Sequence, residues 1–455
     1  MKPENLKTQL HKTLGLSTLW GLGVGYVISG MYCGWNLGLA EGGPFGLLIA
    51  LALVTVMYLA FVLSYSELAC AMPQAGGAFV YSHRVLGKNW GFLAGVAQAI
   101  EFVFAPPAIA AAIGAYFGIF FPQFNPITIA LVAYLIFTAL NCYGVKQSAV
   151  FELIITTLAV VELFIFAGVT GPHFQWAQFS HNALPQGLWG VLPAIPYAVW
   201  FYLGIEGLAN VAEEARNPQK DLSRAFVFSM LTLVVLALLT FFCAVGVGGW
   251  ESVVYVAGSA PGTTSDSPLP MALVKVVGVN HPLYHLLITI GLGGLVASFH
   301  GLILCAGRTT MEFGRVGYAS PALGRTHATR KTPIAALIVN MVIGFIALLT
   351  GHTGEIITIA VFGALTLYAI AMITLLVWRK NHAADIDPAK FKTPGFPAVP
   401  LLALALSVFC LIAMAYFNLK LALIYLGIVA CAFVWFHLGV PDTVKNKDFH
   451  TGESA

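Results

Sequence analysis

Charge is what this 455-residue sequence lacks most: only 9% of its residues are charged, whereas 59% are hydrophobic. About a quarter of the residues of a soluble domain are normally charged, so the composition excludes an ordinary soluble domain of this size. Apolar runs of roughly 20 residues, the length a helix needs to cross a bilayer, recur along the whole chain. The sequence therefore predicts an all-α membrane protein in contact with lipid along its length.

Several motifs of enzymes and pumps are also missing. All six aspartates lie in predicted loops or in the C-terminal tail, which excludes the aspartate pair of an intramembrane protease. Neither a metal-binding HExxH nor a Walker GxxxxGK[ST] sequence occurs. The seven cysteines form no CxxC pair and are expected to be reduced, small apolar residues. We expect no enzyme, no ATP-driven pump, no cofactor, no metal site and no nucleic-acid partner.

The apolar runs predict twelve transmembrane helices within a single domain, residues 1–455. The predicted spans are 14–40, 46–70, 91–121, 127–145, 149–170, 189–211, 225–249, 284–307, 333–351, 355–378, 397–417 and 420–438. The first run lacks a small-residue cleavage site, so we expect a span there and not a cleaved signal. Spans one to ten (14–378) form the predicted core, and spans eleven and twelve (397–438) are peripheral.

The basic residues predict the orientation. With twelve spans, 20 of the 22 lysines and arginines fall on one side, and only Lys275 and Lys420 fall on the other. Loops on the cytoplasmic side carry the excess of lysine and arginine. We therefore expect both termini in the cytoplasm and the protein in the inner (plasma) membrane.

Spans one and six each contain an interruption. Span one carries VISGMYCG (27–34), and span six carries WFYLGIEGLAN (200–210) after two prolines. Glycine costs a helix interior about 1 kcal/mol relative to alanine. Unpaired backbone groups are not tolerated in hydrocarbon, so an unwound stretch lines a cavity where its N–H and C=O groups can bind a ligand. Close helix packing at glycine is the alternative explanation.

The two interruptions lie five spans apart, which indicates a transporter built from inverted repeats, spans 1–5 and 6–10. We expect the backbone groups of both interruptions and nearby polar side chains to bind the substrate. The predicted substrate-binding residues are Val27, Ile28, Ser29, Gly30, Met31, Glu101, Trp200, Tyr202, Leu203, Gly204 and Glu206.

Four ionisable residues inside the spans are candidates for coupling: Glu101, Glu162, Glu206 and His300. No lysine or arginine lies in a predicted span interior. Each acid must therefore be protonated, hydrogen-bonded or neutralised by a visiting cation. Glu162 could equally be a protonated packing residue, and His300 a hydrogen-bonded core residue.

Three further glutamates, Glu67, Glu152 and Glu355, lie closer to the ends of predicted spans. We expect them at the membrane interface.

Four stretches carry a family resemblance. They are ISGMYCGWNLGLAEGG, SELACAMPQAGGAFVYSHRVLG, GIEGLANVAEEARNPQKDLSRA and GRTTMEFGRVGYASPALGR. Through them nearly the whole chain resembles the amino acid–polyamine–organocation (APC) superfamily of permeases. Within that superfamily, IEFVFAPPAIA, AEEARNPQKD and ASFHG are most similar to bacterial ethanolamine permeases.

The resemblance implies a five-plus-five inverted repeat that works by alternating access. It implies that residues 27–31 hold the substrate through backbone groups and that Trp200 is an aromatic gate, although position alone would also allow ordinary packing. It further implies that Glu206 couples substrate binding to gating or to protons.

The sequence departs from this pattern at two places. Met31 stands where ethanolamine-type relatives often have an acid, and TTLAVVELF in span five lacks the lysine of many proton-coupled relatives. Span eight offers Ser298 without an adjacent second hydroxyl, which disfavours sodium without excluding it.

These features predict a secondary active transporter, most simply proton-coupled, of a small amine-bearing solute such as ethanolamine. The alternative is a neutral amino acid or GABA permease, in which a carboxylate would lie on the N–H groups of Ser29 and Gly30. An ion channel is disfavoured, because two broken helices and scattered single acids suit an occluding carrier better than a pore.

Overall fold

The computed structural model describes residues 13–74, 76–144, 149–256, 258–381 and 391–445. All regular secondary-structure elements in these described residues are helices. The α-helices are α1 (Leu16–Val27), α2 (Ser29–Tyr32), α3 (Leu37–Ala71), α4 (Ala78–Leu86), α5 (Lys88–Phe120), α6 (Pro126–Tyr143), α7 (Ala149–Thr170), α8 (Trp176–Phe179), α9 (Ile195–Trp200), α10 (Ser223–Val245), α11 (Glu251–Val254), α12 (Pro268–Val277), α13 (Pro282–Val316), α14 (Pro321–Gly324), α15 (Ile334–Leu349), α16 (Thr353–Asn381), α17 (Ala398–Phe417), α18 (Leu419–Gly439) and α19 (Asp442–Lys445). Three 3-10 helices are η1 (Gly171–His173), η2 (Gly187–Val191) and η3 (Ile205–Glu214), and η4 (Pro218–Leu222) is a π-helix.

The twelve predicted spans are all present. Ten helical segments in the described residues are long and apolar enough to cross a membrane. The remaining two spans are shorter helices: α1 with α2 forms span one, and α15 forms span nine. The α3 helix contains both the end of span one and all of span two, joined by a kink at Gly43 (φ 64°) before Pro44. Glycine is required at that kink because its φ is left-handed.

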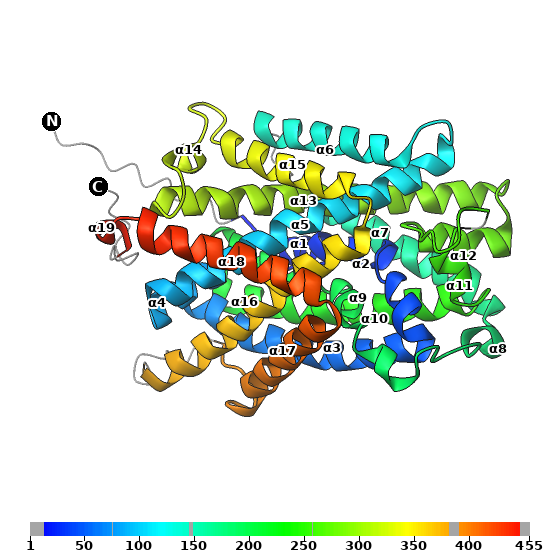
Figure 1. Cartoon of the computed structure of the whole chain (residues 1–455), viewed down its shortest axis with the longest axis horizontal. Coiled ribbons are helices and arrows are strands. Elements are labelled where there is room, and N and C mark those ends of the chain that lie inside the picture. The colour runs from blue at the N-terminus through cyan, green and yellow to red at the C-terminus, as the bar shows by residue number, and fades with distance from the viewer. Residues whose placement is uncertain (1–12, 75, 145–148, 257, 382–390, 446–455) are drawn as a thin grey trace.

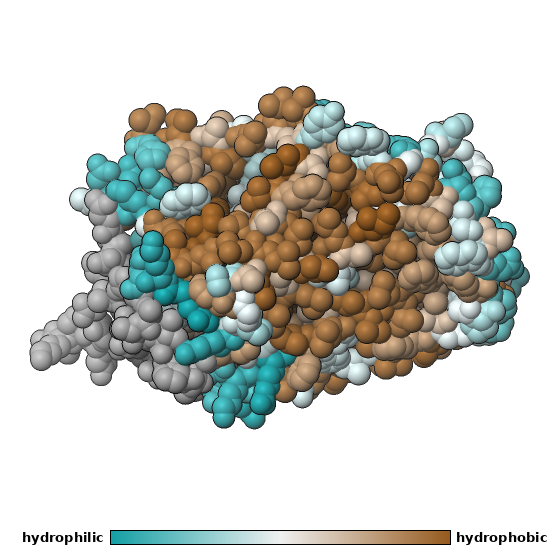
Figure 2. Space-filling view, turned by 90° about the horizontal axis from the view of Figure 1, so that it is seen from below, coloured by the Kyte–Doolittle hydropathy of each residue, from teal (hydrophilic) through white to brown (hydrophobic). Residues whose placement is uncertain are grey.

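The two ends of the molecule differ in charge. Figure 1 places α4, α14 and α19 at one end and α8, α11 and α12 at the other. We call these the basic end and the α12 end, because Arg84, Arg325 and Lys445 lie in or beside the first group. Between them runs a broad apolar belt, brown in Figure 2, that matches the bilayer-facing surface expected of the spans. The gathering of basic residues at one end agrees with the predicted alternation of loops.

Both predicted interruptions are present. In span six, α9 ends at Trp200, residues 201–204 form a turn in which Gly204 has φ 98°, and η3 continues as a 3-10 helix. Span one breaks at the end of the predicted stretch 27–34: Ile28 keeps a helical φ of −59°, whereas Cys33 is extended and Gly34 has φ 84°. A Cβ on Gly34 would lie 2.5 Å from Nε1 of Trp200. Glycine is therefore needed at position 34, where the backbone passes close to the indole.

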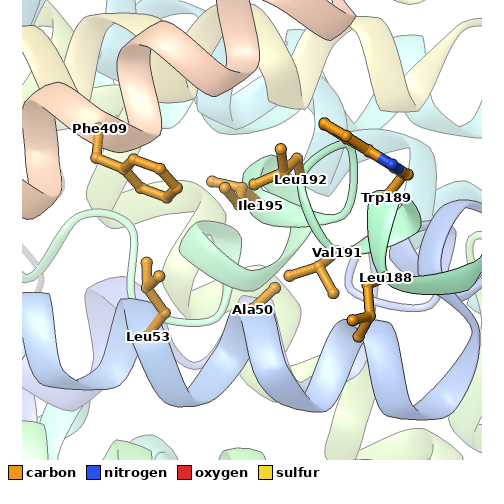
Figure 3. Close-up of a pocket in the computed structure, with 8 residues that line it drawn as sticks. All are labelled: Ala50, Leu53, Leu188, Trp189, Val191, Leu192, Ile195 and Phe409. Atoms are coloured by element: carbon orange, nitrogen blue, oxygen red, sulfur yellow. The ribbon is translucent and has the colours of Figure 1, made fainter.

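The segment that leads into span six packs along span two. Figure 3 shows Leu192 and Ile195 beside Ala50 and Leu53 of α3. At the α12 end this packing is backbone on backbone, since a Cβ on Gly190 would lie 2.6 Å from the carbonyl oxygen of Glu41. The half of span six that carries Trp200 is therefore positioned by spans one and two.

Gly363 allows spans three and ten to approach closely beside Glu101. A Cβ there would lie 2.5 Å from the carbonyl oxygen of Ala97 and 2.9 Å from the backbone nitrogen of Glu101. We expect Gly363→Ala to lower the melting temperature in detergent, since overpacking a tight contact costs about 1–3 kcal/mol. Gly427→Ala is the matched control, because a Cβ at Gly427 meets nothing within 4 Å. Equal melting temperatures for the two variants would contradict this account of the contact.

Candidate functional site

Glu101 and Glu206 face each other at the interruption of span six. Both side chains are buried, Glu101 at 0% and Glu206 at 2% exposure. The two carboxyl groups lie close enough for their charges to interact, and neither oxygen of Glu101 has a hydrogen-bond partner among the described residues. A nearby like charge disfavours the ionised form of a carboxyl group. Two acids thus lie together at the break, and the charge of one disfavours ionisation of the other.

Two tyrosine hydroxyls extend a chain of polar contacts from Glu206 toward span two. The hydroxyl of Tyr368 donates to Oε2 of Glu206 at 2.8 Å, and the hydroxyls of Tyr368 and Tyr58 lie 3.1 Å apart. The Tyr58 hydroxyl in turn lies 3.4 Å from the carbonyl oxygen of Val199 in α9. Glu206 is thus linked through neutral hydroxyls to the outer portion of its own broken span.

Two serines, Ser29 of span one and Ser298 of span eight, form a hydrogen-bonded pair. The Oγ atoms of Ser29 and Ser298 are 2.8 Å apart, and Ser298 donates to the carbonyl oxygen of Tyr26 at 2.8 Å. Because the Ser298 proton is used there, Ser29 is the donor between the two hydroxyls. The sequence offered no second hydroxyl beside Ser298 in span eight; the structure supplies one from span one.

Trp200 joins the two interruptions. Its Nε1 donates to the carbonyl oxygen of Cys33 at 2.9 Å, and its side chain is buried. A Cβ on Gly30 would lie 2.5 Å from the carbonyl oxygen of Trp200, so glycine is required where these backbones meet. Trp200 thus contacts span one at both Gly30 and Cys33.

The remaining predicted binding residues are buried around these contacts. Met31 is fully buried, and its carbonyl oxygen accepts from Nε1 of Trp35 at 3.0 Å. The Tyr202 hydroxyl lies 2.8 Å from Oγ1 of Thr55, which directs it toward span two. The other apolar members of the predicted set, Val27, Ile28 and Leu203, are also buried.

Glu162 has its own partner. The hydroxyl of Tyr32 donates to Oε2 of Glu162 at 2.6 Å. The Tyr32 ring lies against Gly291 and Gly294 of α13, where a Cβ would be 2.9 and 3.1 Å from it. A neighbouring cavity, closed by residues of α12, has room for about one water molecule. Glu162 therefore stabilises the contact of α7 with α2 and is paired independently of Glu206.

His300 is placed as a core histidine. Its Nδ1 is 3.1 Å from Nδ2 of Asn141, and its ring lies edge-on to Phe137. Both partners belong to α6, so His300 contributes to the packing of α13 against α6.

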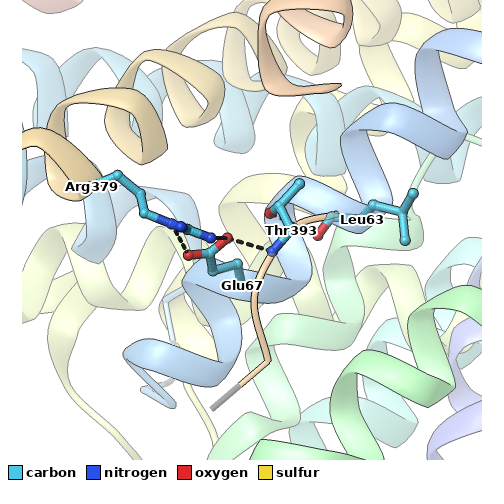
Figure 4. Close-up of polar contacts among 4 residues, drawn as sticks. All are labelled: Leu63, Glu67, Arg379 and Thr393. Atoms are coloured by element: carbon cyan, nitrogen blue, oxygen red, sulfur yellow. Dashed lines mark hydrogen bonds and ion pairs between the residues drawn. The ribbon is translucent and has the colours of Figure 1, made fainter. Parts of the chain in front are cut away.

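Two of the three glutamates expected near the membrane interface are buried inside the protein. Glu67 is 1% exposed and Glu152 is 0% exposed. Glu67 forms a bidentate ion pair with the guanidinium of Arg379 (Figure 4). It also accepts a hydrogen bond from the backbone nitrogen of Thr393 at 2.7 Å. The polypeptide after span ten folds over the end of span two and buries Glu67. The side chain of Glu355 is 44% exposed and lies 3.7 Å from Nζ of Lys420, as expected for the interface.

Sequence reasoning missed three tyrosines. Tyr32, Tyr58 and Tyr368 supply the hydroxyl donors of the buried acids or extend the chain from them. The predicted spans lack lysine and arginine, so the sequence indicated no ion-pair partner for these acids. Tyrosines within the apolar runs were the available signal, since a buried carboxyl group needs hydrogen-bond donors.

Comparison with known proteins identifies the family. The model of the family described as "Amino acid permease" matches residues 18–447. The chain belongs to the amino acid permease family. This permease is 25% identical to an uncharacterized transporter of Rhizobium meliloti over 99% of this chain and 96% of that protein. It is also 25% identical to a branched-chain amino acid permease of Bacillus subtilis over 92% and 91% of the two chains.

Further relatives of the permease differ in what they carry. A serine/threonine exchanger of Bacillus subtilis is 24% identical over 88% of this chain and 91% of that protein. A methylthioribose transporter of the same organism is 26% identical over 89% and 88%. The family therefore makes this chain an amino acid permease-type transporter without fixing its substrate.

A solved structure supports the fold alone. The manganese transporter of Eremococcus coleocola superimposes with a TM-score of 0.56 over 96% of this permease and 98% of that chain, at 14% identity. The two share the arrangement of transmembrane helices at a sequence identity too low to compare their ligands.

Proposed function

We propose that this permease is a proton-coupled secondary transporter of a small amine-bearing solute, with ethanolamine as the first candidate. It would work by alternating access across the inner membrane, with both termini in the cytoplasm. The observation that carries the proposal is the buried Glu101–Glu206 pair at the break of span six. Neither acid forms an ion pair with a described lysine or arginine.

The pair suits an ammonium group. One carboxylate of the pair can face an ammonium ion while the other keeps a proton, which removes their mutual repulsion and lets solute and proton cross together. Tyr368 keeps Oε2 of Glu206 hydrogen-bonded throughout, while Oε1 has no described partner. The free backbone groups of the two interruptions would hold the polar end of the solute.

Trp200 provides the closing contact in this mechanism. Its hydrogen bond to Cys33 ties span six to the extended part of span one. Opening toward the α12 end requires this contact to break, so Trp200 would separate the site from that side whenever the bond is formed.

An amino acid substrate is the second candidate. Two Bacillus subtilis relatives are named for branched-chain amino acids and for serine and threonine. Met31 leaves span one without a negative charge next to Ser29 and Gly30. A substrate carboxylate could lie there on backbone N–H groups, as anions do at helix N-termini, with its ammonium group on the glutamate pair.

Uptake by the purified protein in liposomes tests these alternatives. Ethanolamine, choline, GABA, alanine and arginine are compared with and without a pH gradient, in sodium-containing and sodium-free buffer. We expect ethanolamine to accumulate with an acidic exterior and independently of sodium. Accumulation of alanine alone would favour the amino acid alternative. Free passage of alkali ions without uptake of any of these solutes would contradict a carrier.

A further inference from the structure

A groove between spans two, six and eleven opens on the surface of the apolar belt. Figure 3 shows Ala50 and Leu53 of α3 on one wall, Leu192 and Ile195 at the back, and Phe409 of α17 opposite. Trp189 stands at the end of the groove away from Leu53 and Phe409. The cavity measures about 360 Å³, a size usual for small-molecule sites.

The lining selects an apolar occupant. All eight lining residues are apolar apart from the indole N–H of Trp189, and no charged side chain takes part. Trp189 is 72% exposed and Phe409 is 43% exposed. Tryptophan is enriched where hydrocarbon meets the polar headgroups, which places the mouth of the groove at that level. The groove therefore runs from the interface into the hydrocarbon.

We propose that this groove binds one acyl chain of a phospholipid from the leaflet at the α12 end. A chain inside the groove contacts protein on three sides, whereas a chain on a flat helix surface contacts it on one. In hydrocarbon, packing of this kind and not the hydrophobic effect drives association. Without a charged residue at its mouth, the site recognises the chain and not the headgroup.

An acyl chain in the groove would contact the start of the broken span six and so support it. The back wall belongs to the segment that begins the broken span six, five residues before Trp200 at Ile195. The loop just before this segment is tied to the start of span two, where the backbone nitrogen of Phe45 donates to the carbonyl oxygen of Ala183 at 3.1 Å. The acyl chain packs against the lipid-facing side of this segment, which no other described helix covers at the groove.

Fluorescence quenching by phospholipid with brominated acyl chains tests the site. The full-length protein is reconstituted at increasing mole fractions of brominated phosphatidylcholine, and the Trp189 signal is obtained by difference from Trp189→Phe. The reference is Trp435, 53% exposed on α18 and outside the groove, isolated with Trp435→Phe. We expect half-maximal quenching of Trp189 at a mole fraction roughly threefold lower than for Trp435, because three walls contact the chain.

Two phenylalanine variants on one helix distinguish the groove from general lipid contact. Leu53→Phe narrows the groove, whereas Val56→Phe adds the same ring at a position that is 47% exposed and outside it. We expect Leu53→Phe to remove the threefold difference and Val56→Phe to retain it.

Three results would overturn the proposal. They are equal quenching curves for Trp189 and Trp435 in the unmodified protein, equal effects of the two variants, and absence of Trp189 quenching. The last would mean that protein, such as a second copy of the chain, covers the groove.

Discussion

Glu206→Gln abolishes accumulation driven by a pH gradient while the protein remains folded. The glutamine amide still accepts the hydrogen bond from Tyr368 through its oxygen, so the local contacts survive. It cannot bind and release a proton opposite Glu101. A gradient of about one pH unit is worth about 1.4 kcal/mol per proton, or tenfold accumulation. Liposomes with the variant should reach equal concentrations inside and outside.

Glu162→Gln is the matched control for that result. Glu162 is also a buried carboxyl group that accepts from a tyrosine, at 2.6 Å, but its partner Tyr32 lies on a different helix pair. We expect this variant to retain pH-driven accumulation. Both variants are first checked for a single symmetrical peak in size-exclusion chromatography. Unchanged accumulation in Glu206→Gln would remove Glu206 from the coupling mechanism.

Arg379→Leu should destabilise the protein by about 3–5 kcal/mol, because it leaves the buried Glu67 carboxylate without its counter-ion. Glu67 is 1% exposed, and its remaining described donor is the backbone nitrogen of Thr393. The pair ties the basic ends of spans two and ten to the chain entering span eleven (Figure 4). Unfolding in detergent, followed by thiol exposure at the buried cysteines, measures the loss.

A double-mutant cycle with Glu67→Gln isolates the pair. Once the arginine is gone, loss of the carboxylate charge should cost little, and the two single effects should be far from additive. The exposed pair Lys420–Glu355 is the control, since Lys420→Ala should cost about 0–1 kcal/mol. Additive single effects, or an Arg379→Leu loss no larger than that of Lys420→Ala, would contradict a structural ion pair.

The sequence was sufficient for features that depend on local composition. The spans were predictable because apolar length and the positions of basic loops fix them, and the structure contains all twelve. The break of span six was predictable because Gly204 and the preceding prolines weaken a helix at that point. In span one the glycines indicated a break within residues 27–34, but the contact of Gly34 with the indole of Trp200 joins segments far apart in the sequence.

Features that depend on contacts between distant spans could not be predicted. Nothing near Glu206 in the sequence points to Tyr368, which is 162 residues away, or to Tyr58 beyond it. Glu67 was assigned to the interface because it lies near the end of a span, and only the fold shows that Arg379 and Thr393 cover it. Such partners are set by helix packing and not by local sequence.

The central claim is that the Glu101–Glu206 pair carries a proton across the membrane together with the amine. The most direct test follows isotopic ethanolamine uptake and internal pH in the same liposomes, for the unmodified protein and for Glu206→Gln. The account predicts that internal pH changes together with ethanolamine uptake in the unmodified protein and that this link is lost in the variant. Ethanolamine uptake by the unmodified protein without any change in internal pH would contradict it.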